Sequence, residues 1–258
     1  MTAFILKLIA MAAMLIDHVA FWLVNNNNVM RNIGRVAFIV YAFLIAESYY
    51  HLREKPDHLR SHVLKLLILS TLSEPLHDQY ILLKWTDWKS QNTILMLLIG
   101  FVALILVGWW EDKNALNHVI ARKGAVIICF IAAISAHFLQ TGYGFGGVVM
   151  IVLFYVYLQR ADSFNNFIQR LSVLLLIDII YICIYVWASA GFTGGEAMVE
   201  EAISFNRRLI GSLLAVFPLA FHNRKLGYHS KWFGWLYSCF YPLQFAVLIV
   251  ARYIIRGF

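Results

Sequence analysis

The feature that most limits what this chain can fold into is a series of long apolar segments that recurs from residue 4 to residue 255. Many of these segments are long enough to cross a hydrocarbon layer of about 30 Å, which takes roughly 20 helical residues. Inside lipid, a helix satisfies its own backbone hydrogen-bonding groups. The alternating pattern of an outer-membrane barrel is absent from the sequence. The sequence therefore predicts an all-α, polytopic integral membrane helical bundle.

The apolar segments predict about nine transmembrane helices, which form a single transmembrane domain over residues 1–258. The predicted spans are 4–24, 33–50, 62–83, 92–110, 123–138, 143–158, 169–190, 204–222 and 233–255. Pro75 predicts a kink or break in the third span, and Pro242 predicts a kink in the last. With 61% hydrophobic residues and 14% charged residues, the chain has more apolar surface than a soluble core would bury.

The distribution of Lys and Arg predicts the orientation of the bundle. The loops after the second, fourth, sixth and eighth spans carry more cations than the alternate loops. The positive-inside rule therefore places these loops and the N-terminus in the cytoplasm, in a multi-pass protein of the inner membrane. The net charge of +7 fits contact with anionic lipid headgroups, and no basic patch outside the spans favours nucleic acid.

Ionisable side chains in the first span are candidates for function, because a charge in lipid is costly. Asp17 and His18 place a carboxylate next to an imidazole, as general-base chemistry requires, although a polar pair that packs helices is the alternative. Arg35 near the start of the second span is predicted at a similar depth. It could pair with Asp17, bind a carbonyl or phosphate oxygen, or extend to the headgroups.

Further candidate positions lie in or beside the later spans, at mid-membrane or in the outer half of the predicted topology. They are Glu74, Gln91, Asn92, Tyr143, Gly144, Gly146, Tyr241 and Gln244. The two glycines allow close approach of a ligand or of a neighbouring helix. His58 and His62 lie four residues apart near a predicted cytoplasmic loop, and a solvated loop is favoured over a metal pair. No metal is predicted.

The candidate positions other than His58 and His62 fall in segments that resemble the TraX family, polytopic proteins named for conjugative pilin N-acetylation. The segments are LKLIAMAAMLIDH at 6–18, GRVAFIVYAF at 34–43, SEP at 73–75, QN at 91–92, GYGFGGVVM at 142–150, NRKLG at 223–227 and YSCFYPLQFAVL at 237–248. The sequence departs from the family pattern at Ile39, where the family usually has Pro, and at Gln244, where it usually has His. Lys7 and His18 also look like the basic-x10-His signature of acyltransferase-three membrane enzymes, and His18 resembles the first-span histidine of the lysosomal glucosaminide acetyltransferase.

The resemblance implies acetyl transfer from acetyl-CoA, with the donor entering from the cytoplasm and the acceptor from outside. The implied acceptor is a protein N-terminus, a glycan or a small amine. His18 would be the general base, supported by Asp17, with Arg35 and Glu74 also in the catalytic group. The implied acetyl-CoA contacts are Lys7, Arg53, Lys55, Arg122, Lys123, Arg224, Lys225, Gly144 and Gly146. The implied acceptor contacts are Gln91, Asn92, Tyr143, Tyr241 and Gln244.

Two other functions remain open on the sequence alone. The first is a transporter or channel in which Asp17, His18, Arg35 and Glu74 relay protons or bind a solute. The second is a non-catalytic membrane partner of a larger assembly. A basic, nucleotide-sized site facing the cytoplasm would favour the enzyme, and two alternately gated halves would favour the transporter.

The predicted topology places Lys55 and Glu200 on opposite sides of the membrane. Single cysteines at these positions, in a background where Cys129, Cys183 and Cys239 are replaced by Ser, should label from opposite sides with an impermeant thiol reagent. Labelling of both positions from the same side would contradict the topology.

Overall fold

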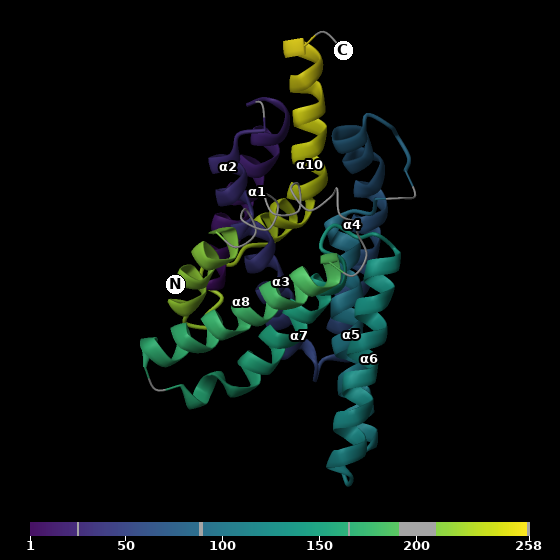
Figure 1. Ribbon diagram of the computed structural model, residues 1–258, viewed down its shortest axis with the longest axis vertical. Coiled ribbons are helices and arrows are strands. Elements are labelled where there is room, and N and C mark those ends of the chain that lie inside the picture. The colour runs from purple at the N-terminus through teal and green to yellow at the C-terminus, as the bar shows by residue number, and fades with distance from the viewer. Residues whose placement is uncertain (25, 88–89, 165, 191–209, 257–258) are drawn as a thin grey trace. The chain divides into compact units, whose positions relative to one another are not determined.

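The computed structural model describes residues 1–24, 26–87, 90–164, 166–190 and 210–256. Its elements are helices (Figure 1): α1 (Ala3–Trp22), α2 (Asn28–Gly34), α3 (Val36–Leu52), α4 (Pro56–Leu82), α5 (Thr93–Lys113), α6 (His118–Phe138), α7 (Gly144–Arg160), the 3-10 turn η1 (Ala161–Ser163), α8 (Phe167–Ala190), the helix Ile210–Ala220 and α10 (Lys231–Arg256). These ranges contain no strand, and an isolated bridge joins Gln91 to Thr141. The all-α class is therefore confirmed for this part of the chain.

Within the described ranges, six helices are long and apolar enough to cross a membrane. They lie at Ala3–Phe21, Asn28–Leu52, Thr93–Lys113, His118–Phe138, Phe167–Ile184 and Lys231–Ile255. Helix α7 and the helix Ile210–Ala220 are apolar but shorter. Helix α4 is long, but Lys65, Glu74 and Asp78 interrupt its apolar residues. The prediction of nine spans is therefore not confirmed, and residues 191–209, which include Glu200, lie outside the described ranges.

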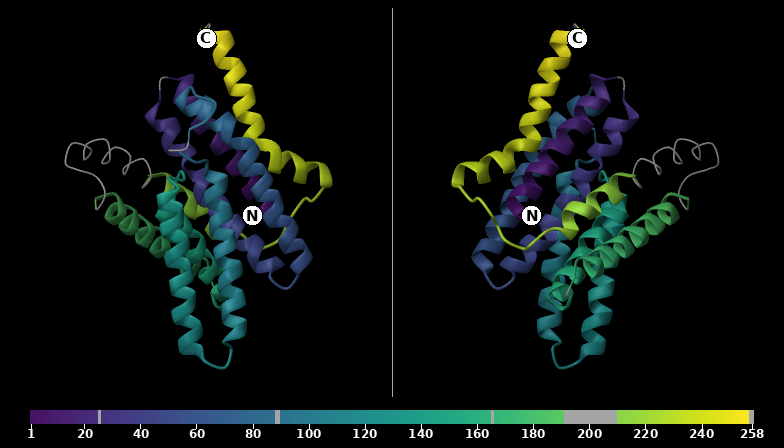
Figure 2. Two further views of the ribbon diagram at one scale, coloured as in Figure 1. Left: turned by 90° about the vertical axis from the view of Figure 1, so that its right-hand side faces the viewer. Right: turned by 90° about the vertical axis from the view of Figure 1, so that its left-hand side faces the viewer.

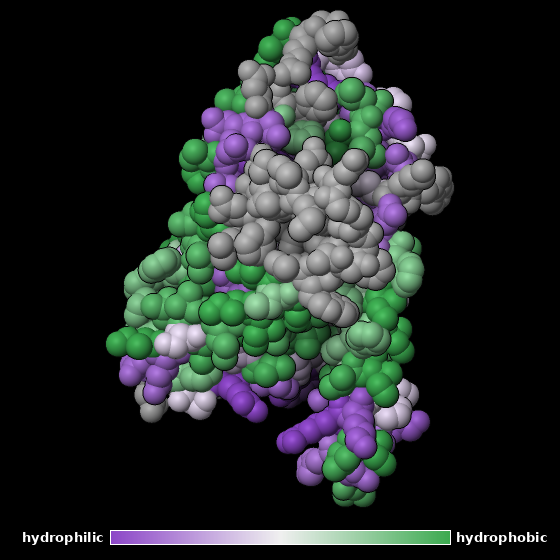
Figure 3. All heavy atoms as spheres, in the orientation of Figure 1, coloured by the Kyte–Doolittle hydropathy of each residue, from purple (hydrophilic) through white to green (hydrophobic). Residues whose placement is uncertain are grey.

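Large apolar side chains are exposed along several of these helices. On α6 they include Val126, Ile127 and Phe130, and on α10 they include Val247 and Ile254. Figure 3 shows broad apolar areas on the visible face, with hydrophilic residues gathered where α5 turns into α6. A surface of this kind fits contact with lipid rather than with water.

The described chain forms two compact units. The first contains residues 1–41, 79–83 and 163–258, and the second contains residues 42–78 and 84–162. Helices α3 and α4 contribute residues to both units, and the two units are described separately below.

In the first unit, α1 packs against α2 and α10. The start of α1 is joined to the segment that precedes α10 by backbone hydrogen bonds, from Ala3 N to the Lys225 carbonyl at 2.8 Å and from Phe4 N to the Leu226 carbonyl at 3.0 Å. Gly227 has a φ of +73°, and a Cβ at this position would approach Thr2 too closely. Glycine is therefore required where this segment passes the first helix.

In the second unit, α5, α6 and α7 pack against one another. Phe101 and Phe154 are almost completely buried in its core. Tyr49 of α3 packs edge-on against Phe101 and Tyr155, with ring centroids 6.0 and 5.1 Å apart. Gly100 lies against Ile151, where any side chain would overlap. Small residues at such contacts let helix backbones approach closely.

Both interior prolines lie within continuous helices. Helix α4 runs through Pro75 to Leu82, so the predicted break at Pro75 is wrong, and His58 and His62 lie in its first turns rather than in a loop. The ring of His62 packs against Phe101, with centroids 4.7 Å apart. Helix α10 contains Pro242 and bends along its length (Figure 2), as expected where proline removes a backbone hydrogen bond.

Asn92 joins the start of α5 to α4. Its Oδ1 accepts from Leu95 N at 3.1 Å and so caps α5. Its Nδ2 donates to the Ser70 carbonyl at 2.7 Å and to the Glu74 carboxylate, which also accepts from Asn92 N at 3.2 Å. A fully buried side chain therefore satisfies groups on two helices.

Replacing Asn92 with Ala should destabilise the protein by about 2–3 kcal/mol, because the cap is lost and buried acceptors on α4 lose a donor. The matched control is Asn117→Ala, which removes an exposed cap of α6 that accepts from Ile120 N at 3.1 Å and should cost about 1 kcal/mol. Thermal unfolding in detergent compares the two variants. Equal losses would contradict the additional role of Asn92.

Candidate functional site

A buried ion pair between α1 and α2 lies at the centre of the candidate site in the first unit. Arg31 Nη1 lies 2.9 Å from Asp17 Oδ2, and both side chains are largely buried. The same nitrogen donates to the Asp17 main-chain carbonyl at 3.3 Å, and the guanidinium lies over the Phe21 ring. Asp17 is therefore paired with Arg31, whereas the sequence alone left Arg35 as a possible partner.

The glycine before Arg35 explains how α2 comes so close to α1. A Cβ at Gly34 would overlap the Asp17 side chain. Asn27 caps α2 by accepting from Met30 N at 3.1 Å, and thereby fixes the turn that brings Arg31 back over α1. Glycine at this position therefore allows the close helix packing on which the ion pair depends.

The imidazole of His18 lies among aromatic rings from two other helices. Its centroid is 4.6 Å from Phe245, 6.0 Å from Tyr80 and 6.4 Å from Tyr241. The Tyr80 hydroxyl also donates to the His18 main-chain carbonyl at 2.5 Å. These contacts hold the first helix against α10 and the end of α4, and they place aromatic rings beside the half-buried imidazole.

Arg252 fixes the end of α4 against α10. Its guanidinium donates to the carbonyls of Tyr80 and Gln79 at 3.3 and 3.4 Å. The last four carbonyls of a helix have no partner within the helix, and a cation there also interacts favourably with the helix dipole. Gln79 Nε2 donates to the Tyr253 hydroxyl at 3.2 Å. The buried Arg252 therefore positions Tyr80 next to His18.

One face of α10 carries further polar side chains. The Tyr237 ring stacks on Tyr41 with centroids 5.8 Å apart, and Lys7 lies 4.9 Å above the Tyr237 centroid. Gln244 is buried, and neither polar atom of its amide has a hydrogen-bond partner. An unpaired buried amide is costly, so Gln244 is the position on this face that a bound molecule would satisfy best.

Asp178 of α8 is a second buried acid in the first unit, and it was not among the candidate residues predicted from the sequence. One oxygen accepts from Ser212 Oγ at 3.1 Å, and the other has no hydrogen-bond partner. The neighbouring Gly211 lies against Arg35, because a Cβ at Gly211 would overlap that side chain. The signal was present in the sequence, since Asp178 is an acid within a predicted span.

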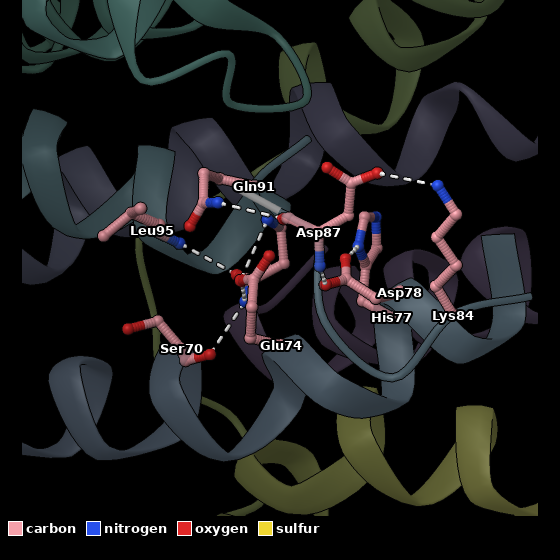
Figure 4. Close-up of polar contacts among 9 residues, drawn as sticks. Ser70, Glu74, His77, Asp78, Lys84, Asp87, Gln91 and Leu95 are labelled. Atoms are coloured by element: carbon pink, nitrogen blue, oxygen red, sulfur yellow. Dashed lines mark hydrogen bonds and ion pairs between the residues drawn. The ribbon is translucent and has the colours of Figure 1, made fainter. Parts of the chain in front are cut away.

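In the second unit, Glu74 belongs to a polar group between α4 and the start of α5 (Figure 4). Asn92 donates to Glu74, and Asp87 N donates to Asp78 Oδ2 at 2.6 Å. Gln91 Nε2 donates to the Asp87 carbonyl at 3.5 Å. The predicted residues Glu74, Gln91 and Asn92 are therefore brought together, but Asn92 is occupied by structural hydrogen bonds.

The predicted donor-binding cations fall into two groups. In the second unit, Arg53 and Lys55 follow α3, and Arg122 and Lys123 are in the first turns of α6. Tyr49 near the end of α3 lies against Gly108 near the end of α5, and the Trp110 indole at the end of α5 donates to the Ile120 carbonyl at the start of α6. Because these three helix ends meet, the four exposed cations lie towards the same end of that unit. Arg224 and Lys225 lie in the first unit, beside the start of α1.

The glycines at the start of α7 lie at the other end of the second unit from these four cations. Gly144 contacts His137 at the end of α6, and its φ is +47°. Tyr143 is the residue that precedes α7, and Gly146 is buried within its first turn. Within the second unit, Gly144 and Gly146 are therefore separated from Arg53, Lys55, Arg122 and Lys123, with which they were grouped as donor contacts.

Comparison with known proteins identifies one family. A family model described as TraX protein matches residues 3–252, nearly the whole chain. The comparisons with curated proteins and with solved structures give no match. The resemblance inferred from the sequence motifs is thereby confirmed.

Arg31→Ala should destabilise the protein by about 3–5 kcal/mol, because it leaves the Asp17 carboxylate buried without its partner. The combined Asp17→Asn and Arg31→Gln variant should lose less, since no buried charge remains. The control is Lys84→Ala, which removes an exposed partner 3.9 Å from Asp87 and should cost less than about 1 kcal/mol. Thermal unfolding in detergent measures all three, and similar losses for Arg31→Ala and Lys84→Ala would contradict the role of the pair.

Proposed function

This chain belongs to the TraX family, and on that premise we propose that it is a membrane-embedded acetyltransferase. It transfers an acetyl group from acetyl-CoA to an amine or hydroxyl of an acceptor at the membrane, with His18 as the general base. The TraX family is associated with pilin acetylation, which favours a protein amino group among the acceptors.

The observation that carries this proposal is the setting of His18. An imidazole is the side chain best suited to act as a neutral base near physiological pH. The rings of Phe245, Tyr80 and Tyr241 place apolar surface beside the imidazole, and reduced access of water on that side would limit hydrolysis of the thioester in favour of transfer.

The proposed step is a direct transfer. The acceptor nitrogen or oxygen attacks the thioester carbonyl carbon while the imidazole of His18 takes the proton from the attacking atom. The carbon–sulfur bond then breaks, the acetyl group remains on the acceptor, and CoA leaves as a thiolate that takes up a proton. The developing oxyanion requires a donor, for which Arg35 of the first unit is proposed.

Asp17 is proposed to position the helix that carries His18 rather than to contact the reacting atoms. Adjacent residues of a helix point about 100° apart, and the Asp17 carboxylate is paired with Arg31. This pair holds α2 against α1 and so fixes the helix that carries His18. Asp17 is therefore a positioning residue in this proposal, and His18 is the catalytic one.

The exposed cations support binding of the donor from the cytoplasmic side. Arg53, Lys55, Arg122 and Lys123 present positive charge to phosphates at one end of the second unit. Arg252 is buried and bonded to helix carbonyls, so it does not count against the orientation that the loops favour. An inner-membrane protein with a cytoplasmic N-terminus remains the proposed topology.

The acceptor contacts proposed in the first unit are Tyr241 and Gln244. Tyr241 lies against His18, and the buried Gln244 amide has hydrogen-bonding capacity that its neighbours do not use. The family usually has His at position 244, so the amide would here bind and orient the acceptor where an imidazole could also transfer a proton.

His18→Ala should lower acetyl transfer by on the order of a hundredfold to ten-thousandfold, because a positioned general base is lost. The assay follows release of CoA from radiolabelled acetyl-CoA and labelling of a peptide with a free N-terminus, using protein purified in detergent. The matched control is His58→Ala, an exposed histidine on α4, which should leave turnover unchanged. A correctly folded His18→Ala protein with near wild-type turnover would exclude His18 as the base.

A further inference from the structure

Helix α4 carries three side chains of the kinds that bind divalent transition metals. Glu74, His77 and Asp78 each offer one ligand atom, and these atoms all lie within 4.8 Å of one another. Their spacing of i, i+3 and i+4 places them on one face of the helix. Figure 4 shows the three side chains next to one another along α4, and all three belong to the second unit.

Hydrogen bonds from outside the group orient one oxygen of each carboxylate. Glu74 Oε2 accepts from Asn92, while Glu74 Oε1 is buried and has no hydrogen-bond partner. Asp78 Oδ2 accepts from Asp87 N, while Asp78 Oδ1 lies 3.3 Å from His77 Nδ1. Hydrogen bonds of this kind orient metal ligands in proteins. The remaining oxygen of Glu74 has no hydrogen-bond partner, and the remaining oxygen of Asp78 bonds only within the group, to His77.

The distance between Asp78 and His77 fits coordination of one ion. Two ligand atoms that each lie about 2.0–2.1 Å from a tetrahedral zinc ion are separated by about 3.3 Å. The Asp78 side chain is about 1% exposed and that of His77 is 13% exposed, so the ligands are held by the protein. Electrostatic repulsion also favours a bound cation, because two carboxylates close together in a buried region repel each other unless a proton or a cation lies between them.

We propose that Glu74, His77 and Asp78 form a binding site for one divalent transition metal ion, with zinc as the best match to one nitrogen and two oxygen ligands. Calcium and magnesium are disfavoured, because they prefer oxygen ligands alone. Three protein ligands leave a fourth position for water or for a substrate atom. The proposal is independent of acetyl transfer and goes beyond it.

Metal binding is measured on the full-length protein in detergent after removal of metals with a chelator. Zinc titration by calorimetry and metal content by mass spectrometry should give one zinc ion per chain. Glu74→Gln and His77→Ala should each weaken binding by at least about tenfold, since ligand loss exceeds the effect of losing an outer partner. The matched controls are Asp87→Asn, an acid whose side chain pairs with Lys84, and His58→Ala, and both should bind zinc like the wild type.

Two further measurements guard against variants that fail to fold. Zinc should raise the unfolding temperature of the wild type and of the controls, but not that of Glu74→Gln or His77→Ala. Cobalt added to the wild-type protein should give the visible absorption of a four-coordinate ion with a nitrogen ligand. Failure of the wild type to bind zinc, or equal binding by the His77→Ala variant, would overturn the proposal in favour of a simple His77–Asp78 ion pair.

Discussion

The constraint on which the rest of the structure depends is that polar groups in an apolar interior must have partners. Helix ends are the most demanding case, because each leaves backbone groups without partners in the helix. Arg252 donates to two carbonyls at the end of α4, and Asn92 caps α5 while donating to α4. Each of these side chains joins two helices, so satisfying the backbone also determines which helices pack together.

The candidate catalytic site is a product of the same constraint. Tyr80 reaches the His18 carbonyl because Arg252 fixes the end of α4. The side chain of Asp17, which points about 100° away from that of His18 on α1, is held by Arg31. The histidine is therefore positioned by contacts on two faces of the helix that carries it, and the general-base role proposed for it would require such preorganisation.

The sequence predicted the helical class, because apolar runs are local signals. Intramembrane charges are local signals too, and they made Asp17 and His18 candidates whose role stays a prediction. It did not predict that Arg31 pairs with Asp17, because that contact depends on the turn before α2 and on the close approach at Gly34. Asn92 was interpreted as a substrate contact, and its hydrogen bonds to Ser70 and Glu74 show that it connects helices. The Glu74, His77 and Asp78 group was missed, although its helical spacing is visible in the sequence once α4 is known to continue through Pro75. Long-range partners of this kind follow from tertiary packing, which local patterns do not encode.

The hydrogen bonds from Ala3 and Phe4 to the segment at residues 225–226 have a consequence for biosynthesis. The first helix leaves the ribosome more than two hundred residues before this partner segment is made. At about 5–20 residues per second, that interval is on the order of tens of seconds. During this time α1 lacks Tyr241 and Phe245, two of the rings that pack near His18, since α10 follows the other described helices in the chain. Completion of the first unit therefore waits for the synthesis of α10, and a chain that stalls before α10 holds its histidine in an unfinished bundle.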